Sequence, residues 1–295
     1  MQKVLKKSPV IGFVRYSQKI DFDGIRDMFE PEYFEYRFQI FKDITLKSFQ
    51  SQTNKNFLLL IIHSENIPAH YKERFFELER DNIFLKNIFI ADTAEAFEKA
   101  LKNSLHYLNF QNGAAVTFRI DNDDAIPNNF IENLCLFLNS AFVGSCINLP
   151  NVLIVKRAQT DQYLVERRYF PSNSMGLAYV TCENNFKTIF DVNQHHLINE
   201  NNNLILLPKH SGMPIQTING ENASNYIIDI DSVKFTEKQL QEFLKDNNYD
   251  EINLKCLKIL SNKKRLSIND IFNLLTPPIC KIVAFKIYTF MRQKK

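Results

Sequence analysis

Phe57-Leu-Leu-Leu-Ile-Ile62 is an unbroken run of six apolar residues. A run of this kind is typical of a central strand in a mostly parallel sheet, because helices cover such a strand on both faces. A shorter apolar run, Val10-Ile-Gly-Phe-Val14, precedes it and is followed by the polar residues Arg15, Tyr16 and Ser17. Each run predicts a buried strand, and the first of them has a polar carboxyl end.

Helix-like and strand-like segments alternate around these two runs. Helices are predicted over Tyr36–Phe49, from Pro68 to about Arg80, and from the capping-box pattern Asp92-Thr-Ala-Glu95, with Asp92 as the cap, to Gly113. Two more strands are predicted at Ile83–Ile90 and Ala114–Ile120. The alternation indicates βαβ units, and therefore an α/β fold with a Rossmann-like, mostly parallel central sheet flanked by helices.

Beyond residue 150 the pattern predicts shorter elements. Strands are expected at Val152–Lys156, Gly176–Val180 and Leu204–Leu207, and helices at Asn184–Leu197, Thr236–Leu244, Glu251–Leu260 and Ser267–Leu275. The simplest interpretation is one α/β domain over residues 1–225, followed by a helical, basic carboxyl-terminal extension over residues 226–295.

The formal net charge of +3 conceals a polarised chain. Residues 255–295 hold ten Lys and Arg residues against Asp270 alone, a net charge of +9, so residues 1–254 carry −6. A net acidic body argues against a nucleic-acid partner. Five cysteines without a C-x-x-C spacing argue against a zinc cluster or a disulfide framework, and favour a cytoplasmic location.

The basic segment 255–295 has three open interpretations. It could bind an anionic membrane surface, pack on the domain as a solvated basic helix, or bind nucleic acid. Its longest apolar stretch, Ile279–Met291, contains Lys281 and Lys286 and is too short to cross a bilayer. We expect peripheral attachment at the inner face of the membrane.

The stretch Thr117-Phe-Arg-Ile-Asp-Asn-Asp-Asp-Ala-Ile-Pro127 carries the clearest chemical signal. Asp121, Asp123 and Asp124 follow a predicted buried strand, and three carboxylates this close repel one another unless a positive group lies among them. A D-x-D pair at a strand end can hold Mg²⁺ or Mn²⁺ together with a diphosphate. Ligands of open α/β sheets bind beyond the carboxyl ends of the strands, so this block and the polar residues after Val14 should converge on one crevice.

The acidic block is also compatible with other structures. An acid-rich turn with no ligand is common. An EF-hand loop is excluded because Ile126 stands where the sharp turn needs glycine. A two-metal polymerase or nuclease stays possible in principle, although the net negative charge of residues 1–254 disfavours it.

Three segments carry a resemblance to a known family. They are Val10–Ser17, Leu46–Ile62 and Phe118–Ile126, and Met213–Asn225 is similar to a further segment of the same family. These segments resemble the nucleotide-sugar half of a GT-A-fold glycosyltransferase and, more narrowly, the bacterial putative rhamnosyltransferase family. The resemblance covers about residues 9–225. It implies a GT-A-like domain with a nucleotide-sugar half over about 1–130 and an acceptor half over about 131–225.

The resemblance also implies an activity. The enzyme would move a hexosyl or deoxyhexosyl unit from a nucleoside diphosphate donor to an acceptor hydroxyl in bacterial capsule or lipopolysaccharide synthesis. The acceptor would be a glycan or a glycolipid, lipid-linked or polysaccharide. An alternative is a catalytically degenerate nucleotide-sugar-binding or scaffold protein of the same pathway, because Asn219 stands where the family pattern has His.

Candidate site residues follow from the same resemblance. The nucleotide-sugar contacts are expected from Arg15, Tyr16, Ser17, Arg119, Asp121, Asp123 and Asp124. Asp121, Asp123 and Asn219 would bind Mg²⁺ or Mn²⁺, and His210 could substitute for Asn219. If the reaction inverts the anomeric centre, a carboxylate must deprotonate the acceptor hydroxyl. Asp191 is favoured over Glu183, because His195 would lie one helical turn away, although an Asp-His pair on a helix surface needs no catalytic role.

Overall fold

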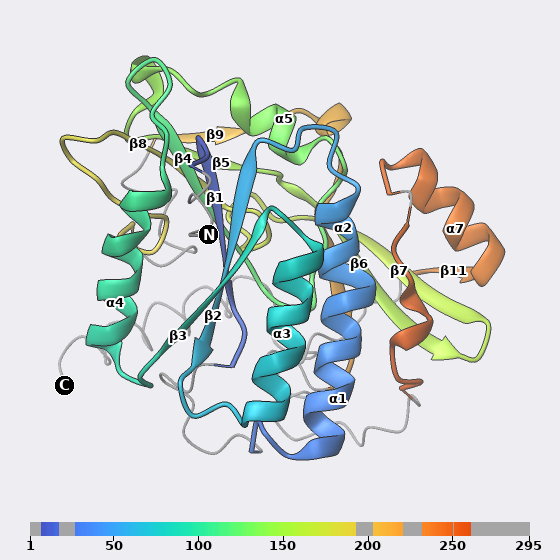
Figure 1. Cartoon of the computed structure of the whole chain (residues 1–295). Coiled ribbons are helices and arrows are strands. Elements are labelled where there is room, and N and C mark those ends of the chain that lie inside the picture. Colours follow the sequence, from blue (N-terminus) through green and yellow to red (C-terminus); the bar gives the residue numbers. More distant parts are fainter. Residues whose placement is uncertain (1–6, 18–26, 193–202, 221–231, 250, 261–295) are drawn as a thin grey trace, which may run out of the picture. The chain divides into compact units, whose positions relative to one another are not determined.

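The computed structural model describes residues 7–17, 27–192, 203–220, 232–249 and 251–260. All of these residues belong to one compact unit that reaches Leu260. Within them, a seven-stranded sheet has the order β3-β2-β1-β4-β8-β5-β9 (Figure 1). Its strands are β1 (Val10–Arg15), β2 (Phe57–Ser64), β3 (Leu85–Ile90), β4 (Ala115–Ile120), β5 (Cys146–Asn148), β8 (Ala178–Thr181) and β9 (Leu204–Leu206).

This sheet is mostly parallel. Strand β1 pairs in parallel with both β2 and β4, and β2 pairs in parallel with β3. Strand β8 runs antiparallel to both of its neighbours, β4 and β5. The predicted fold class, an α/β fold with a mostly parallel central sheet flanked by helices, is confirmed, and all four strands predicted before residue 121 are present.

Helices cover β2 on both faces, as its apolar run predicts. Leu59 and Ile61 belong to one core cluster, with aromatic side chains of α1 (Pro31–Ile40) and α3 (Ala69–Asp81). Leu58, Leu60 and Ile62 belong to another, with apolar side chains of α4 (Ala94–Asn103). Successive residues of a strand point to opposite faces, so a continuous apolar run fills both cores.

The first predicted helix is present and starts earlier than expected. Helix α1 begins at Pro31, whose fixed φ suits the first helical turn. It continues through a π-helical segment, Phe41–Leu46, into the short helix α2 (Lys47–Gln50). The prediction for Tyr36–Phe49 therefore falls within one continuous helical stretch, and the helix predicted from Pro68 to about Arg80 corresponds to α3.

Two details of the third predicted helix were wrong. Thr93, not Asp92, caps α4, because its hydroxyl accepts a hydrogen bond from the Ala96 N–H at 3.1 Å. The helix ends at Asn103 and is followed by a 3₁₀ turn, Ser104–Tyr107, so it does not extend to Gly113.

A second sheet, of four strands in the described residues, has the order β10-β6-β7-β11. Its strands are β6 (Asn151–Gln159), β7 (Gln162–Tyr169), β10 (Ile215–Ile218) and β11 (Val233–Thr236). Strand β6 contains the predicted segment Val152–Lys156, whereas β7 was not predicted. Helix α7 (Glu237–Asp246) follows β11, and Thr236 and Gln239 form its capping box. The helix predicted at Thr236–Leu244 is thus confirmed.

Two other predicted helices were wrong where the structure describes them. Residues 184–192 form turns, because the Asp191 side chain accepts hydrogen bonds from Thr188 in place of a helical backbone pattern. Residues 251–260 contain only a 3₁₀ turn, Leu254–Cys256, whose apolar side chains complete the core under the second sheet. Residues 193–197 of the helix predicted at Asn184–Leu197 lie outside the described residues, and so does the helix predicted at Ser267–Leu275. Within the described ranges, no helix has the length and apolarity that a membrane crossing needs.

Candidate functional site

The carboxyl ends of β1 and β4 lie side by side, because the two strands pair in parallel. The amide nitrogen Nδ2 of Asn122 donates to the backbone carbonyl of Tyr16 at 3.3 Å and joins the two strand ends directly. The polar residues after β1 and the acidic block after β4 therefore meet at one edge of the sheet, as the βαβ pattern predicts.

Arg37 of α1 reaches into the acidic block. Its Nη1 lies 2.9 Å from Oδ2 of Asp123, and its Nη2 donates to the side-chain oxygen of Asn122. Asp123 is buried and Arg37 is mostly buried, with 8% and 15% of their side chains exposed. Burial disfavours the charged guanidinium, but the Asp123 carboxylate together with Tyr33 and Tyr16 outweighs this effect, so the pKa of Arg37 is raised. The sequence did not predict Arg37 as a site residue.

Asn219 donates a second hydrogen bond to the Asp123 carboxylate. This fully buried residue follows β10, and its Nδ2 donates to Oδ2 of Asp123 at 2.9 Å. Its backbone carbonyl accepts a hydrogen bond from the Tyr36 hydroxyl at 3.1 Å. Tyr36 and Arg37 are consecutive in α1, so one turn of this helix positions both Asn219 and Asp123.

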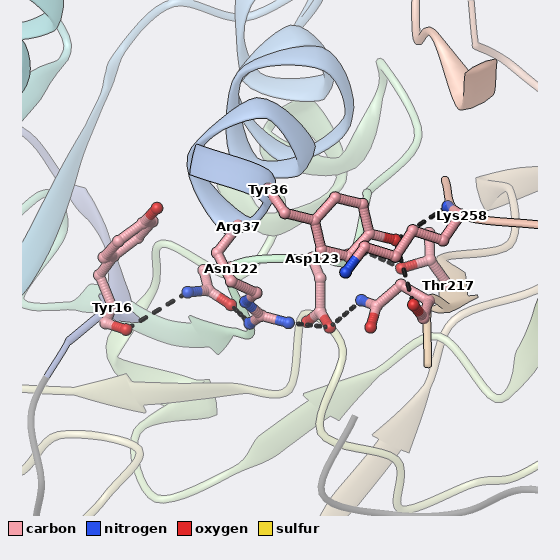
Figure 2. A network of polar contacts seen from close by, with 8 residues as sticks. Tyr16, Tyr36, Arg37, Asn122, Asp123, Thr217 and Lys258 are labelled. Carbon is pink, nitrogen blue, oxygen red and sulfur yellow. Dashed lines mark hydrogen bonds and ion pairs between the residues drawn. The ribbon is translucent and has the colours of Figure 1, made fainter. Parts of the chain in front are cut away.

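Two further contacts close this network. The Thr217 hydroxyl donates to the backbone carbonyl of Asp123 at 2.7 Å. The backbone N–H of Lys258 donates to the Tyr36 hydroxyl at 2.9 Å, and its ammonium lies 4.2 Å from the centre of the Tyr36 ring. The segment after α7 is thereby tied to the same helix turn as the acidic block (Figure 2).

The other two aspartates of the block differ in exposure. Asp121 is half exposed and pairs with Arg119 of β4, with Nη2 and Oδ1 3.5 Å apart. Asp124 is buried and receives a hydrogen bond from the Thr217 backbone. Burial, with the neighbouring charges of Asp123 and Asp121, raises its pKa well above the usual range.

The predicted metal ligands do not present a set of oxygens to one ion in this arrangement. Asn219 turns its amide nitrogen, not its oxygen, toward Asp123, because a carboxylate oxygen can only accept. Oδ2 of Asp123 already accepts from two donors. In the part of the chain that the structure describes, no group of three His, Cys, Asp or Glu side chains is placed to hold a metal ion. His210, the predicted substitute, is exposed on the short 3₁₀ turn Lys209–Ser211.

Tyr16 and Ser17 lie at the strand end, but their side chains face the protein. The Tyr16 ring is buried against Phe34, Phe41 and Phe75, and burial raises the pKa of its hydroxyl. The Ser17 hydroxyl accepts a hydrogen bond from the Ser64 N–H at 3.3 Å. Any contact of Tyr16 with a nucleobase would therefore come from its main chain.

A second polar cluster at the strand ends was not predicted. The Ser64 hydroxyl at the end of β2 donates to Oδ2 of Asp92 at 2.6 Å, and the Asn66 amide donates to the same oxygen at 3.4 Å. Asp92 follows β3, so this cluster extends the polar edge past Arg15 and Ser17 across the neighbouring strands. Its signal in the sequence is the change from apolar to polar residues after β2 and after β3.

Asp191 lies in a turn and not in a helix. Its Oδ2 accepts from the Thr188 backbone N–H at 2.7 Å and from the Thr188 hydroxyl at 2.9 Å. The side chain is exposed, and so is the alternative Glu183. His195, the proposed helical partner, lies outside the described residues.

A cavity of about 430 Å³ lies elsewhere, between the edge strand β3 and helix α4. Asn87, Ile90, Lys99, Asn103 and Tyr107 are among its lining residues. None of the predicted site residues lines it. The cavity is thus separate from the acidic block.

Comparison with known proteins identifies the class. The family described as "Putative rhamnosyl transferase" matches residues 10–229, which is most of the chain and includes both strand ends and the acidic block. The chain belongs to this family, and the resemblance inferred from the sequence is confirmed. The protein is thus a member of a glycosyltransferase family with an α/β fold. No curated protein matches the chain.

Likeness to solved structures is weak. S. aureus TarS, residues 1–349, has 11% identity and a TM-score of 0.29, over 51% of this chain and 35% of that chain. The same S. aureus protein in complex with UDP-GlcNAc also has 11% identity and a TM-score of 0.29, over 51% of this chain and 34% of that one. The match thus spans about a third of the length of these structures. TM-scores of this size do not support an inference about function. The function is therefore inferred from the family and from the site of this chain.

Proposed function

We propose that this protein is a glycosyltransferase that transfers a sugar from a nucleoside diphosphate donor to an acceptor hydroxyl. The observation that carries the proposal is the junction of the β1 and β4 ends, where Asn122 bridges to Tyr16 beside the buried pair of Arg37 and Asp123. In open α/β sheets ligands bind beyond the carboxyl ends of the strands. Family membership supports sugar transfer as the chemistry, and we assign that chemistry to this edge of the sheet.

Arginines at the strand ends suit the pyrophosphate of such a donor. Arg15 ends β1, and Arg119 lies next to the end of β4. A guanidinium binds phosphate oxygens through paired N–H groups, which fixes orientation as well as charge. We assign the donor diphosphate to this pair, and we assign the half-exposed Asp121 to a contact with the donor sugar.

The general base of an inverting reaction is assigned to Asp191, as a proposal. Its exposed carboxylate is held by Thr188. A base must lie within hydrogen-bond reach of the hydroxyl that it deprotonates. Asp191→Asn should lower transfer to an acceptor by at least about a hundredfold and leave donor binding within about threefold. Unchanged transfer would remove Asp191 from the mechanism.

The proposal is tested by release of nucleoside diphosphate from a panel of UDP-, dTDP- and GDP-sugars. The wild type should turn over at least one donor. Asp123→Asn, which keeps the side-chain volume but removes the charge that holds Arg37, should reduce the rate at least about tenfold. Asp81→Asn, at the exposed end of α3, is the matched control and should leave the rate unchanged. Equal rates in all three proteins, or release from no donor, would contradict the proposal.

The acceptor is proposed to be lipid-linked or a polysaccharide, in capsule or lipopolysaccharide synthesis. The support is the charge of residues 255–295, since Lys and Arg near an anionic surface contribute about 1 kcal/mol each. The triple variant Lys281→Gln, Lys286→Gln, Arg292→Gln should sediment several-fold less with phosphatidylglycerol vesicles than the wild type. Equal sedimentation would contradict membrane attachment through this segment.

A second candidate function is nucleotide-sugar binding without transfer. Asn219 favours it, because its amide nitrogen, and not its oxygen, faces Asp123. This candidate predicts that a nucleotide sugar raises the melting temperature of the protein while no donor is turned over. Turnover by the wild type would exclude it.

A further inference from the structure

Two arginines compensate the acidic block from within the protein. Arg37 of α1 pairs with Asp123, and Arg119 of β4 pairs with Asp121. The third carboxylate, Asp124, is buried and held by the backbone of Thr217. Three ionised carboxylates would carry a charge of −3, and these two guanidinium groups reduce it to −1. Burial and the neighbouring carboxylates raise the pKa of Asp124, which favours its neutral form and lowers the negative charge of the cluster further. A diphosphate therefore meets a much weaker repulsion than the sequence of the block implies.

The contact at Asp123 resembles what a divalent cation would otherwise provide. Each carboxylate oxygen offers two lone pairs, and Oδ2 of Asp123 accepts from Arg37 and from Asn219, each at 2.9 Å. Because Asn219 is fully buried and only 15% of the Arg37 side chain is exposed, bulk water screens this arrangement little. A metal ion at the same oxygen would have to displace one of them.

The shape of the guanidinium explains why arginine occupies this position. Nη1 of Arg37 donates to Asp123 and Nη2 donates to the side-chain oxygen of Asn122. One planar group thus hydrogen-bonds to two successive residues of the turn. A lysine would supply the charge but could not hold both residues in this geometry. Arg37 thus sets the position of the turn as well as its charge.

We propose that Arg37 is the resident counter-ion of the acidic block, in place of a divalent cation, so that nucleoside diphosphates bind here without metal. This inference rests on the proposed function, because it concerns the diphosphate part of the donor. Arg37 acts through Asp123 and the turn, and is therefore a positioning residue.

The test is calorimetric titration of UDP, dTDP and GDP into the full chain, once with EDTA and once with Mn²⁺. The tightest of the three is then titrated into Arg37→Gln, Arg37→Lys and Asn219→Asp. Arg80→Gln, an exposed arginine of α3, is the matched control. Asn219→Asp adds a second carboxylate beside Asp123 and leaves Arg37 in place, so it tests the charge balance even if Arg37→Gln does not fold.

The inference expects a specific pattern of affinities. The wild type and Arg80→Gln should bind equally with EDTA and with Mn²⁺, within about threefold. Arg37→Gln and Asn219→Asp should bind at least about tenfold more weakly with EDTA, and Mn²⁺ should restore most of the loss. The affinity of Arg37→Lys with EDTA should lie between those of the wild type and Arg37→Gln, because lysine keeps the charge and loses the contact with Asn122.

Three results would overturn it. Wild-type binding that requires Mn²⁺ would overturn this inference alone and leave the proposed function intact. Metal-independent binding that neither Arg37→Gln nor Asn219→Asp weakens would do the same. Failure of all three nucleotides to bind the wild type in either buffer would overturn the proposed function, and this inference with it.

Discussion

Arg37 and Asp123 are 86 positions apart in the chain, and their side chains form a buried ion pair of 2.9 Å. The pair joins α1 to the turn after β4, and Asn219 joins the same aspartate to the end of β10. The acidic block is therefore fixed from both sheets at once. Its chemistry cannot be inferred from the three aspartates alone.

Breaking this pair should destabilise the protein. Arg37→Met keeps the length of the side chain but leaves Asp123 buried without a cation, which typically costs about 3 kcal/mol in free energy of unfolding. Urea denaturation measures this change. Arg80→Gln, whose ion pair with Glu73 is exposed, should change the free energy by less than about 0.5 kcal/mol. If Arg37→Met lowers the free energy of unfolding by less than about 1 kcal/mol, water solvates the Asp123 carboxylate in place of Arg37, and the ion pair is not needed for stability.

The Tyr36 hydroxyl should contribute to stability through two backbone contacts. It donates to the Asn219 carbonyl and accepts from the Lys258 N–H, so Tyr36→Phe leaves both groups without this partner. We expect a loss of about 1 to 2 kcal/mol in free energy of unfolding. Tyr169→Phe, at a side chain that is 65% exposed, is the matched control and should have almost no effect. Equal stability of the two variants would mean that these contacts contribute nothing.

Gly12 of β1 should not tolerate a side chain. An added Cβ would lie 2.2 Å from the ring of Phe118 in the neighbouring strand β4. Gly12→Ala should therefore lower the free energy of unfolding by about 1 to 3 kcal/mol through overpacking. In a Phe118→Leu background the smaller side chain leaves room, so the same substitution should cost less. A double-mutant cycle with additive effects would contradict this explanation.

His63 should make stability depend on pH. It is fully buried at the end of β2, its Nε2 lies 3.0 Å from the Asn87 side-chain oxygen, and its Nδ1 has no partner among the described residues. Burial lowers its pKa to about 3, a hydrogen bond to Asn87 opposes this shift, and the charge of Lys72 adds to it. The lone histidine at this strand end is thus part of the core.

The sign of the effect follows from linkage. Between pH 6.5 and about 3 the unfolded chain binds the proton and the folded chain does not, so the free energy of unfolding falls as pH falls. The loss should reach about 2 to 3 kcal/mol at pH 4.5. His63→Gln keeps an N–H donor toward Asn87 but cannot titrate, so its stability should fall less over this range. Identical pH dependence in both proteins, measured by urea denaturation, would exclude His63 as the cause.

The sequence predicts the parallel half of the fold well, because its strands are continuous apolar runs. Phe57–Ile62 and Val10–Val14 each have to fill a buried position in the sheet, and few other structures suit such runs. Strand β7 was missed because its sequence, Gln162–Tyr169, mixes charged and apolar residues without strict alternation. It becomes a strand through its antiparallel pairing with β6, which local pattern does not encode.

Helical spacing alone was misleading after residue 180. Phe186, Ile189 and Phe190 have helix-like spacing, but they reach the core from a chain of turns. The hydrogen bonds between Thr188 and Asp191 compete with a helical backbone there. Tertiary contact overrides periodicity in such a segment.

The candidate site could be predicted only in part. The acidic block and the polar end of β1 stand out because polar residues follow apolar strands directly. Arg37 and Tyr36 do not stand out, since both lie within an ordinary helix and their partners are distant in the chain. Only the fold brings them to Asp123 and Asn219.

The central claim is that the ends of β1 and β4 bind a nucleoside diphosphate sugar. Hydrogen–deuterium exchange of the full chain, with and without the tightest-binding donor, tests it most directly. We predict that the donor slows exchange in two segments, residues 10–17 and 115–125. Protection confined to residues 85–107, around the cavity between β3 and α4, would contradict the claim.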